Sequence, residues 1–247
     1  MTQLTEELRS LGSAQAPRTL KLRVLQETTG GDRYAAMSTP LGNAFVAFSR
    51  NGISAVRRMD DPGAFERWFE DEHGRPARRV DALPERLRRR PAYDLRGLSS
   101  FEQAVLRKAL EIPPGEVRTY SWIASEISKP KAVRAVGSAL GRNPIPVLIP
   151  CHRVVRTDGT IGEYGLGGPE AKRIMLAAEG AEPDELERLA RRGVRYVGSD
   201  TNNVFCFPTC RHARRIAEAH RVGFRSEGEA LAAGYRACQA CRPALAS

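Results

Sequence analysis

Apolar and polar residues alternate in the first part of the chain, which is the pattern of strands that bury one face. Leucine and valine alternate with polar residues at 20–24, a Pro-Leu-Gly-Asn turn follows at 40–43, and apolar runs occupy 44–48 and 53–56. Turn residues between such runs mark a hairpin. The pattern therefore predicts a small sheet between residues 19 and 57.

A helical periodicity replaces this alternation at 62–73, where aromatic residues recur on one side. Sheet and helix together predict a small α+β domain over residues 19–96, preceded by a polar tail at 1–18. The basic run from Arg86 to Arg90 is interpreted as a solvated linker.

A second unit is predicted over residues 97–180. Apolar side chains at helical spacing follow Ser99 and Ser100, either of which can cap a helix, and prolines after residue 112 end it. Two short helices are predicted at 121–127 and 132–140, with a Lys-Pro-Lys turn between them. Helix, turn and helix within about 20 residues is typical of DNA-reading elements, although many helical hairpins bind nothing.

The last of these helices is built from small residues. Ala135, Gly137 and Ser138 let its backbone come close to a partner, and Arg134 projects from its first turn. Tight packing on a neighbouring element and contact with DNA explain this composition equally well.

The segment that follows concentrates the candidate chemistry. Three prolines exclude a helix and apolar residues draw the chain inward, so Cys151 and His152 stand at the end of a buried, rigid stretch. A free cysteine in such a place is often only a small hydrophobic residue. It is a nucleophile if His152 accepts the thiol proton, Arg153 and Arg156 favour the thiolate, and a carboxylate orients the imidazole. Glu179 is the candidate carboxylate.

Composition limits the class of protein. The 247 residues carry 39 Lys and Arg against 29 Asp and Glu, a net charge of +10, which permits binding to a polyanion such as nucleic acid. No apolar run reaches the roughly 18 residues of a membrane-spanning helix, and the amino end lacks a secretory signal pattern. We therefore expect a cytoplasmic protein without membrane association.

Four of the five cysteines lie near the carboxyl end as two close pairs. Paired thiolates in a segment of about 50 residues with few apolar side chains indicate a structural tetrahedral zinc site. The predicted ligands are Cys206, Cys210, Cys238 and Cys241, with an iron–sulfur cluster as the alternative. A charged helical linker at 181–194 precedes this domain, which is predicted over 195–247 with a helical stretch between the cysteine pairs.

Several motifs resemble the O6-alkylguanine-DNA alkyltransferases. They are Ile149-Pro150-Cys151-His152-Arg153-Val154, Arg134-Ala135-Val136-Gly137, Asn143-Pro144, Val117-Arg118-Thr119-Tyr120 and Ala178-Glu179-Gly180. The resemblance implies irreversible transfer of an alkyl group from a flipped-out guanine in double-stranded DNA to Cys151, with no organic cofactor. It also implies a small ribonuclease-H-like α/β domain at the amino end and a helical, winged-helix-like catalytic domain after it.

The resemblance assigns roles to further residues. His152 acts through water as the base, Glu179 holds His152, and Asn143 braces the turn around the cysteine. Tyr120 helps to protonate the guanine leaving group. Arg134 fills the space of the flipped base, with Ala135, Gly137 and Ser138 against the minor groove.

The stretch 163–172 departs from the family pattern by one extra glycine. Tyr164 is nevertheless assigned to the wall of the base pocket. The backbone amide that contacts the guanine oxygen is left unassigned.

The carboxyl-terminal segment resembles the metal-binding domain of the Ada adaptive-response proteins. The similarity rests on the stretches 204–211 and 229–238. It implies a second methyl acceptor at Cys206, for methylphosphotriesters of DNA. A structural zinc module that only adds DNA affinity is the equal alternative.

These observations lead to one main hypothesis and one competitor. The main hypothesis is a monomeric, single-turnover DNA repair methyltransferase that acts on O6-alkylguanine and on O4-alkylthymine. The competitor is a non-enzymatic lesion-binding protein with a structural zinc module, in which Cys151 is a buried hydrophobic residue. A Cys-His hydrolase is a third reading, which repeated turnover of a small ester would reveal.

Overall fold

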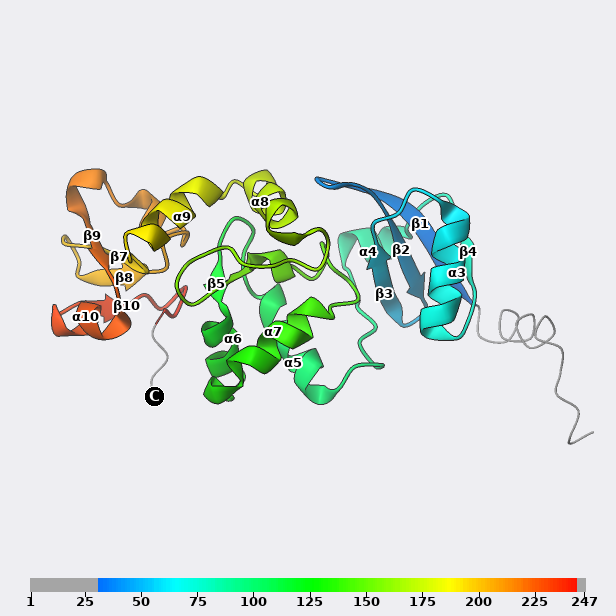
Figure 1. Ribbon diagram of the computed structural model, residues 1–247, viewed down its shortest axis with the longest axis horizontal. Coiled ribbons are helices and arrows are strands. Elements are labelled where there is room, and N and C mark those ends of the chain that lie inside the picture. Colours follow the sequence, from blue (N-terminus) through cyan, green and yellow to red (C-terminus); the bar gives the residue numbers. More distant parts are fainter. Residues whose placement is uncertain (1–30, 244–247) are drawn as a thin grey trace, which may run out of the picture. The chain divides into compact units, whose positions relative to one another are not determined.

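The computed structural model of the protein describes residues 31–243, which form two compact units (Figure 1). The first unit holds residues 31–37 and 44–94, and the second holds residues 38–43 and 95–243. The tail predicted at 1–18 and the strand expected at 20–24 lie outside the described residues. Between residues 31 and 243 no helix has the length and apolar character that a membrane span requires. Both units mix helices with sheets, so the predicted α+β class is confirmed.

The first unit is a four-stranded sheet with a helix that crosses between two of its strands. The strand order is β3-β2-β1-β4; β2 and β3 are antiparallel, whereas β4 runs parallel to β1. Asp61 caps the crossing helix by accepting hydrogen bonds from two amides of its first turn. The elements are β1 (Asp32–Thr39), β2 (Gly42–Ser49), β3 (Gly52–Arg57), α3 (Pro62–His73), β4 (Ala77–Arg79) and α4 (Glu85–Arg89).

Aromatic rings from strands and helix form the core of this unit. The Phe65 ring lies 4.7 Å from that of Tyr34 and 5.3 Å from that of Phe45, measured between centroids. The interpretation of the basic run as a solvated linker is wrong in part: the arginines from Arg86 to Arg90 are exposed as predicted, but the run is not a linker. Residues 85–89 form α4, because Leu87 is buried while the neighbouring arginines pair with Glu85.

The second unit begins with the three predicted helices, α5 (Ser100–Leu110), α6 (Tyr120–Glu126) and α7 (Val133–Gly141). Ser99 caps α5 in a reciprocal capping box with Glu102. A short 3-10 turn, η2 (Cys151–Arg153), leads into β6 (Val154–Val155), which pairs in parallel with β5 (Arg118–Thr119). The segment after α7 therefore returns beside the start of α6.

Two further helices follow in the second unit, α8 (Gly168–Ala178) and α9 (Pro183–Arg191). The charged helical linker predicted at 181–194 is helical, since it contains α9. This helix also packs on the rest of the unit. Leu186 of α9 packs in one buried cluster with Val117, Val155 and Leu176.

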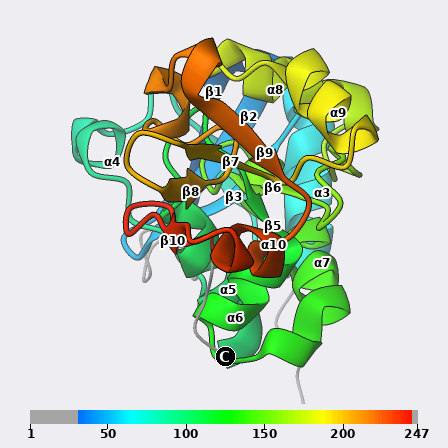
Figure 2. The same cartoon turned by 90° about the vertical axis from the view of Figure 1, so that its left-hand side faces the viewer.

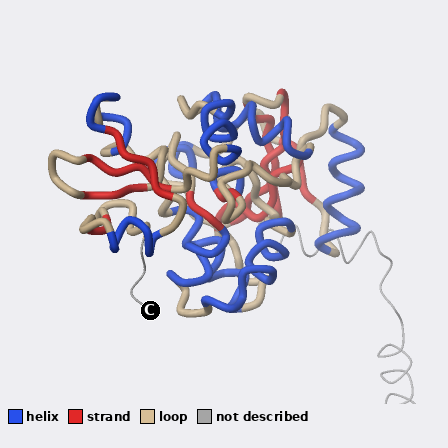
Figure 3. The backbone as a smooth tube through the Cα atoms, turned by 60° about the vertical axis from the view of Figure 1, so that its left-hand side comes forward, coloured by secondary structure: helices blue, strands red, loops and turns tan. Residues whose placement is uncertain are grey.

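The carboxyl-terminal part is a second four-stranded sheet in the order β10-β8-β7-β9. Its elements are β7 (Tyr196–Ser199), β8 (Val204–Cys206), β9 (Arg221–Phe224), α10 (Glu227–Ala232) and β10 (Arg236–Ala237). Figure 2 shows α10 beside this sheet, and Figure 3 shows how few helical residues the region holds.

The expectation of a helical stretch between the two cysteine pairs is therefore wrong in part. Residues 221–224 form β9, which pairs with β7, and only two single 3-10 turns and the short α10 are helical. Gly198 allows this arrangement, because an added Cβ would lie 2.7 Å from the Tyr235 ring.

The capping box generates a stability prediction. Replacement of the cap in Ser99→Ala leaves the Glu102 amide without its acceptor and is expected to cost about 1 kcal/mol of unfolding free energy. Urea unfolding followed by circular dichroism measures the loss. The matched control is Ser100→Ala, one residue further into the helix, which should change stability by less than about 0.5 kcal/mol. Equal losses in the two variants would contradict the assignment of the cap.

Candidate active site and metal centre

Cys151 lies at the end of the proline-rich segment, as the sequence predicts. Its amide donates to the Ile149 carbonyl at 2.8 Å, and the residue is only 7% exposed. Burial raises the pKa of the Cys151 thiol, although a hydrogen bond from Asn143 and the charge of Lys172 oppose this effect. The thiol is thus protonated at rest and needs a base before it can react.

Asn143 holds the turn around the cysteine. Its Nδ2 lies 3.2 Å from Cys151 Sγ and 3.0 Å from the Ile149 carbonyl, and its Oδ1 accepts the Ile145 amide at 3.0 Å. One amide side chain therefore fixes both ends of the proline segment and donates to the sulfur itself.

Glu179 collects donors from three directions. His152 Nε2 lies 2.8 Å from its Oε1, Arg153 contacts both carboxylate oxygens at 2.7–3.1 Å, and the Gly115 amide donates to Oε2 at 3.0 Å. Burial alone would raise the pKa of Glu179, but the hydrogen bonds from His152 and Arg153 outweigh it and lower the pKa to about 2.

The ionised Glu179 determines the tautomer of His152. A carboxylate can only accept, so Nε2 of the fully buried imidazole carries the proton and Nδ1 is the free acceptor. Within residues 31–243, Nδ1 has no hydrogen-bond partner. It is therefore the nitrogen that can take a proton from the neighbouring thiol.

Arg153 does not act on the sulfur as expected. Its guanidinium is committed to Glu179 and to the Ile112 carbonyl at 2.6 Å. The cation whose charge lowers the pKa of Cys151 is Lys172, which sequence reasoning did not single out as functional.

Lys172 is fully buried on α8. Its Nζ donates to the carbonyls of Val154 at 2.6 Å and Glu163 at 3.2 Å, and lies 5.8 Å from the centre of the Tyr120 ring. Burial lowers the pKa of Lys172 to about 8. A lysine at an inward-facing position of an amphipathic helix, inside a recognised motif, is the signal that would have found it.

Two tyrosines line the same site. Burial, followed by the charge of Cys151, raises the pKa of Tyr120, and the same two causes act on Tyr164. The Tyr164 ring stands edge-on to His152 at 6.0 Å between centroids. Both phenols therefore keep their protons at neutral pH.

Gly167 and Gly168 form a turn at the start of α8. They adopt positive φ values of 123° and 72°, which glycine takes without strain, and the Gly168 amide donates to the Tyr164 carbonyl at 2.8 Å. Tyr164 stands before this turn and Lys172 after it, and both side chains lie within electrostatic reach of Cys151.

The outer face of α7 carries the residues predicted to contact DNA. Arg134, Ala135 and Ser138 are exposed, whereas Val136, Ala139 and Leu140 are buried. Gly137 faces Tyr120, because an added Cβ would lie 3.9 Å from its ring. In the part of the chain that the structure describes, the Arg134 side chain makes no hydrogen bond or ion pair. Three of the four small or basic residues thus face outward instead of serving internal packing.

The four carboxyl-terminal cysteines converge on one point. All are buried and unpaired by disulfides, and their sulfurs lie within 4.8 Å of one another. Tetrahedral zinc with bonds of about 2.3 Å separates its sulfur ligands by roughly 3.8 Å, so the cluster fits the ion with a small contraction. His220 instead contacts Asp200, at 2.9 Å. The donor set is therefore the predicted one, and zinc is the cofactor it fits.

Two family models match the chain. The DNA-binding domain of 6-O-methylguanine DNA methyltransferases matches residues 100–181, and the metal-binding domain of Ada matches residues 189–244. The two matches define the class of the second unit, a DNA-binding domain of the DNA methyltransferase type followed by an Ada-type metal-binding domain.

Individual relatives agree with this class. Mouse methylated-DNA–protein-cysteine methyltransferase is 43% identical over 175 residues, which cover 60% of this chain and 81% of the relative. The Mycobacterium tuberculosis enzyme is 34% identical over 158 residues, 59% of this chain and 91% of the relative. The chain belongs to the family of methylated-DNA–protein-cysteine methyltransferases.

The Ada protein of Escherichia coli, a bifunctional transcriptional activator and DNA repair enzyme, is 35% identical over 189 residues. The match covers 69% of this chain but 52% of Ada, about half of its length. Among solved structures, the O6-methylguanine methyltransferase of M. tuberculosis superposes with a TM-score of 0.49 at 28% identity, covering 64% of this chain and 99% of that one.

The low pKa of Glu179 predicts an acid-dependent stability. A carboxylate whose folded pKa of about 2 lies below the ordinary 4.5 contributes stability that is complete above pH 4.5 and is lost as the pH falls towards 2. Across that range the wild type should lose up to about 3 kcal/mol more than Glu179→Gln, measured by urea unfolding at each pH. The exposed neighbour supplies the control, Glu182→Gln, which should follow the wild type. Parallel curves for wild type and Glu179→Gln would contradict the assignment.

The cysteine cluster predicts a single bound zinc ion per chain. Atomic emission on dialysed protein should find about one equivalent in the wild type and in Cys151→Ser, and close to none in Cys238→Ser, because three thiolates leave the tetrahedron open. Equal zinc in Cys238→Ser and Cys151→Ser would place the metal elsewhere.

Proposed function

We propose that this protein repairs DNA by direct reversal of damage, moving an alkyl group from O6 of guanine, or O4 of thymine, in duplex DNA to Cys151. The observation that carries the proposal is the buried thiol whose sulfur contacts Asn143, next to an imidazole that an ionised Glu179 holds in one tautomer. The sulfur is not regenerated, so each molecule acts once.

The proposed reaction balances without any further reactant. His152 Nδ1 takes the thiol proton, directly or through water, and the sulfur then attacks the alkyl carbon. The new S–C bond forms as the C–O bond breaks. The electron pair of the broken C–O bond stays with the guanine oxygen. The base needs one proton to become guanine again. In the proposed reaction the Tyr120 phenol donates this proton and is then reprotonated by the proton held at His152.

Two neighbouring side chains stabilise the negative charge of the Cys151 thiolate. Asn143 donates to the sulfur and the buried Lys172 lowers the pKa of the thiol electrostatically. The Glu179 charge is already matched by Arg153, so it orients His152 without raising the thiol pKa strongly.

The proposed partner is double-stranded DNA with a flipped-out lesion. The exposed face of α7, with Arg134, Ala135 and Ser138, supports docking in the minor groove, and Arg134 is free to occupy the space of the flipped base. Gly137 and Tyr120 lie beneath that face. Tyr164 then forms one wall of the pocket.

We propose a second acceptor role for Cys206, towards methylphosphotriesters of DNA. Bound zinc would keep all four sulfurs as thiolates at neutral pH, and basic side chains surround the module. Cys206 is 2% exposed, so a phosphotriester reaches it only if the segment 206–210 moves. The experiment below tests the two acceptors separately.

The protein is further proposed to act as a monomer in the cytoplasm. One acceptor thiol is consumed per lesion, which needs no second subunit. All five cysteines are unpaired, as expected in a reducing compartment.

Peptide mass spectrometry tests the function. Zinc-loaded protein mixed with duplex DNA that carries only O6-methylguanine should gain one methyl group on Cys151, and Cys151→Ser should gain none while still binding the duplex. DNA treated with a methylating agent should add a methyl group on Cys206. Bound duplex with no methyl group on either cysteine would overturn the proposal in favour of a lesion-binding protein. Methyl on Cys151 alone would leave zinc with a structural role.

A further inference from the structure

The zinc module, residues 195–243, contacts the part of the second unit before it, residues 95–194, which we call the catalytic part. The contact is made through a short segment, Gly115–Arg118, which we call the bracing segment. The Val117 amide donates to Thr209 Oγ1 at 2.8 Å, and both groups are buried. The Arg211 amide donates to Glu116 Oε1 at 3.0 Å. Thr209 and Arg211 flank the zinc ligand Cys210 in sequence, so the metal-binding turn itself makes these contacts.

A buried ion pair sits at this contact. Glu116 and Arg118 lie 2.7 Å apart with side chains about 5% exposed, and the Arg118 guanidinium lies 5.2 Å from the centre of the Phe207 ring. Phe207 follows the ligand Cys206. A buried pair is more favourable when more of its remaining hydrogen-bonding groups are satisfied. The Arg211 amide donates to Glu116 and the Phe207 ring lies against the Arg118 guanidinium, whereas Arg118 Nε has no hydrogen-bond partner among the described residues. The two contacts from the module exist only while the module is folded.

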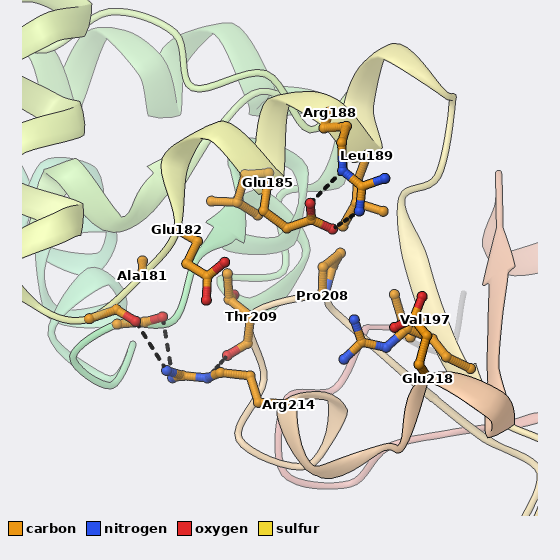
Figure 4. Close-up of a pocket in the computed structure, with 14 residues that line it drawn as sticks. Ala181, Glu182, Glu185, Arg188, Leu189, Val197, Pro208, Thr209, Arg214 and Glu218 are labelled. Atoms are coloured by element: carbon orange, nitrogen blue, oxygen red, sulfur yellow. Dashed lines mark hydrogen bonds and ion pairs between the residues drawn. The ribbon is translucent and has the colours of Figure 1, made fainter.

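Arg214 extends the contact to Glu179. Its Nη2 donates to the Gly115 carbonyl at 3.3 Å, its Nη1 to the Gly180 carbonyl at 3.4 Å, and its Nε to the Thr209 carbonyl at 3.1 Å. Figure 4 shows the guanidinium of Arg214 reaching across to these groups at the edge of a cavity of about 450 Å³ between α9 and the module.

The two carbonyls that accept hydrogen bonds from Arg214, those of Gly115 and Gly180, lie close to Glu179. Gly115 donates its amide to Glu179 Oε2, and Gly180 is the next residue along the chain. The backbones are in close approach, because a Cβ on Gly115 would lie 2.6 Å from the Glu179 carbonyl oxygen. A small shift of Gly115 therefore displaces the carboxylate that orients His152.

A second contact ties the module to the helix-turn-helix. Trp122 Nε1 of α6 donates to the Arg242 carbonyl at 3.0 Å, and the Arg242 guanidinium lies 2.8 Å from Glu126. Arg242 directly follows the ligand Cys241. Both ends of the zinc site are thus anchored on the catalytic part.

We propose that the zinc module positions the alkyl-transfer site: Arg214, together with the metal-binding turn 206–210, holds Gly115 and Gly180 around Glu179, so that zinc loading sets the rate at which Cys151 reacts. This inference rests on the transferase function proposed above. Arg214 is a positioning residue, because it acts on His152 through Glu179 and touches no reacting atom.

Chelation of zinc from the full chain tests the coupling. In a Trp68→Phe background, Trp122 is the single tryptophan, and its emission should shift when the metal is removed because its hydrogen bond to Arg242 is lost. The rate constant for methyl transfer from O6-methylguanine duplex at saturating DNA should fall about tenfold or more, a size that displacement of a catalytic group can reach. Readdition of zinc should restore both signals.

The single-turnover reaction separates positioning from loss of folded protein. The amplitude counts the competent molecules, whereas the rate constant reports the reactivity of each one. Arg214→Ala, fully loaded with zinc, should keep the amplitude and lower the rate constant several-fold, and Arg214→Lys should recover part of the loss. Arg215→Ala removes the same charge one residue away and should react as the wild type, since within residues 31–243 its side chain has no hydrogen-bond or ionic partner.

Three results would overturn the inference. They are an unchanged rate constant in chelated protein whose Trp122 emission has shifted, no shift of that emission on chelation, and equal rate constants for Arg214→Ala and Arg215→Ala. Failure of the zinc-loaded wild type to methylate Cys151 would instead refute the proposed function, so the two failures are distinguishable.

Discussion

The Glu179 carboxylate is the interaction on which the active site depends. It accepts hydrogen bonds from an imidazole and a guanidinium, which the adjacent residues His152 and Arg153 supply, and from the distant backbone amide of Gly115. A half-buried carboxylate is favourable only with that many donors, and the donors in turn fix its ionisation. The ionised state fixes the tautomer of His152, which leaves one ring nitrogen for the thiol proton.

The second feature of the site is the contrast between its two sulfur environments. Cys151 is buried, and burial raises the pKa of its thiol against the opposing effects of one amide hydrogen bond and the charge of Lys172. The four clustered sulfurs are instead arranged for a cation. A buried thiol needs a base to become a thiolate, whereas a bound metal would keep its sulfur ligands as thiolates.

The fold links these two chemistries through the bracing segment. Residues 118–119 pair with β6, which directly follows the η2 turn that carries Cys151, while residues 115–117 meet the zinc module and Glu179. The bracing segment, with Thr119 after it, consequently contacts the strand that follows the Cys151 turn, the Glu179 carboxylate and the metal-binding turn. Its rigidity matters more than its own chemistry, because it carries no group that reacts.

Much of the architecture followed from local sequence rules. The helices at 62–73 and 100–110 were predictable because apolar side chains recur at helical spacing behind a capping residue. The four zinc ligands were predictable from their spacing. Two cysteine pairs, each with two or three residues between its members, lie in a segment with few apolar side chains, and such a segment needs a metal to fold. The strand β9 escaped prediction because its pairing with β7 lies beyond any local pattern.

Sequence alone thus indicated most of the helices, the candidate nucleophile and the ligand set, since each depends on residue type and short-range spacing. Only the tertiary structure decided which charges meet. In the folded protein Arg153 pairs with Glu179 instead of the thiol, and the charge of the buried Lys172 acts on Cys151. The fold also brings the Arg214 guanidinium to the carbonyl of Gly115, 99 residues away in the chain. Hydrogen bonds and electrostatic fields act through space and depend on burial, and no pattern along the chain records either.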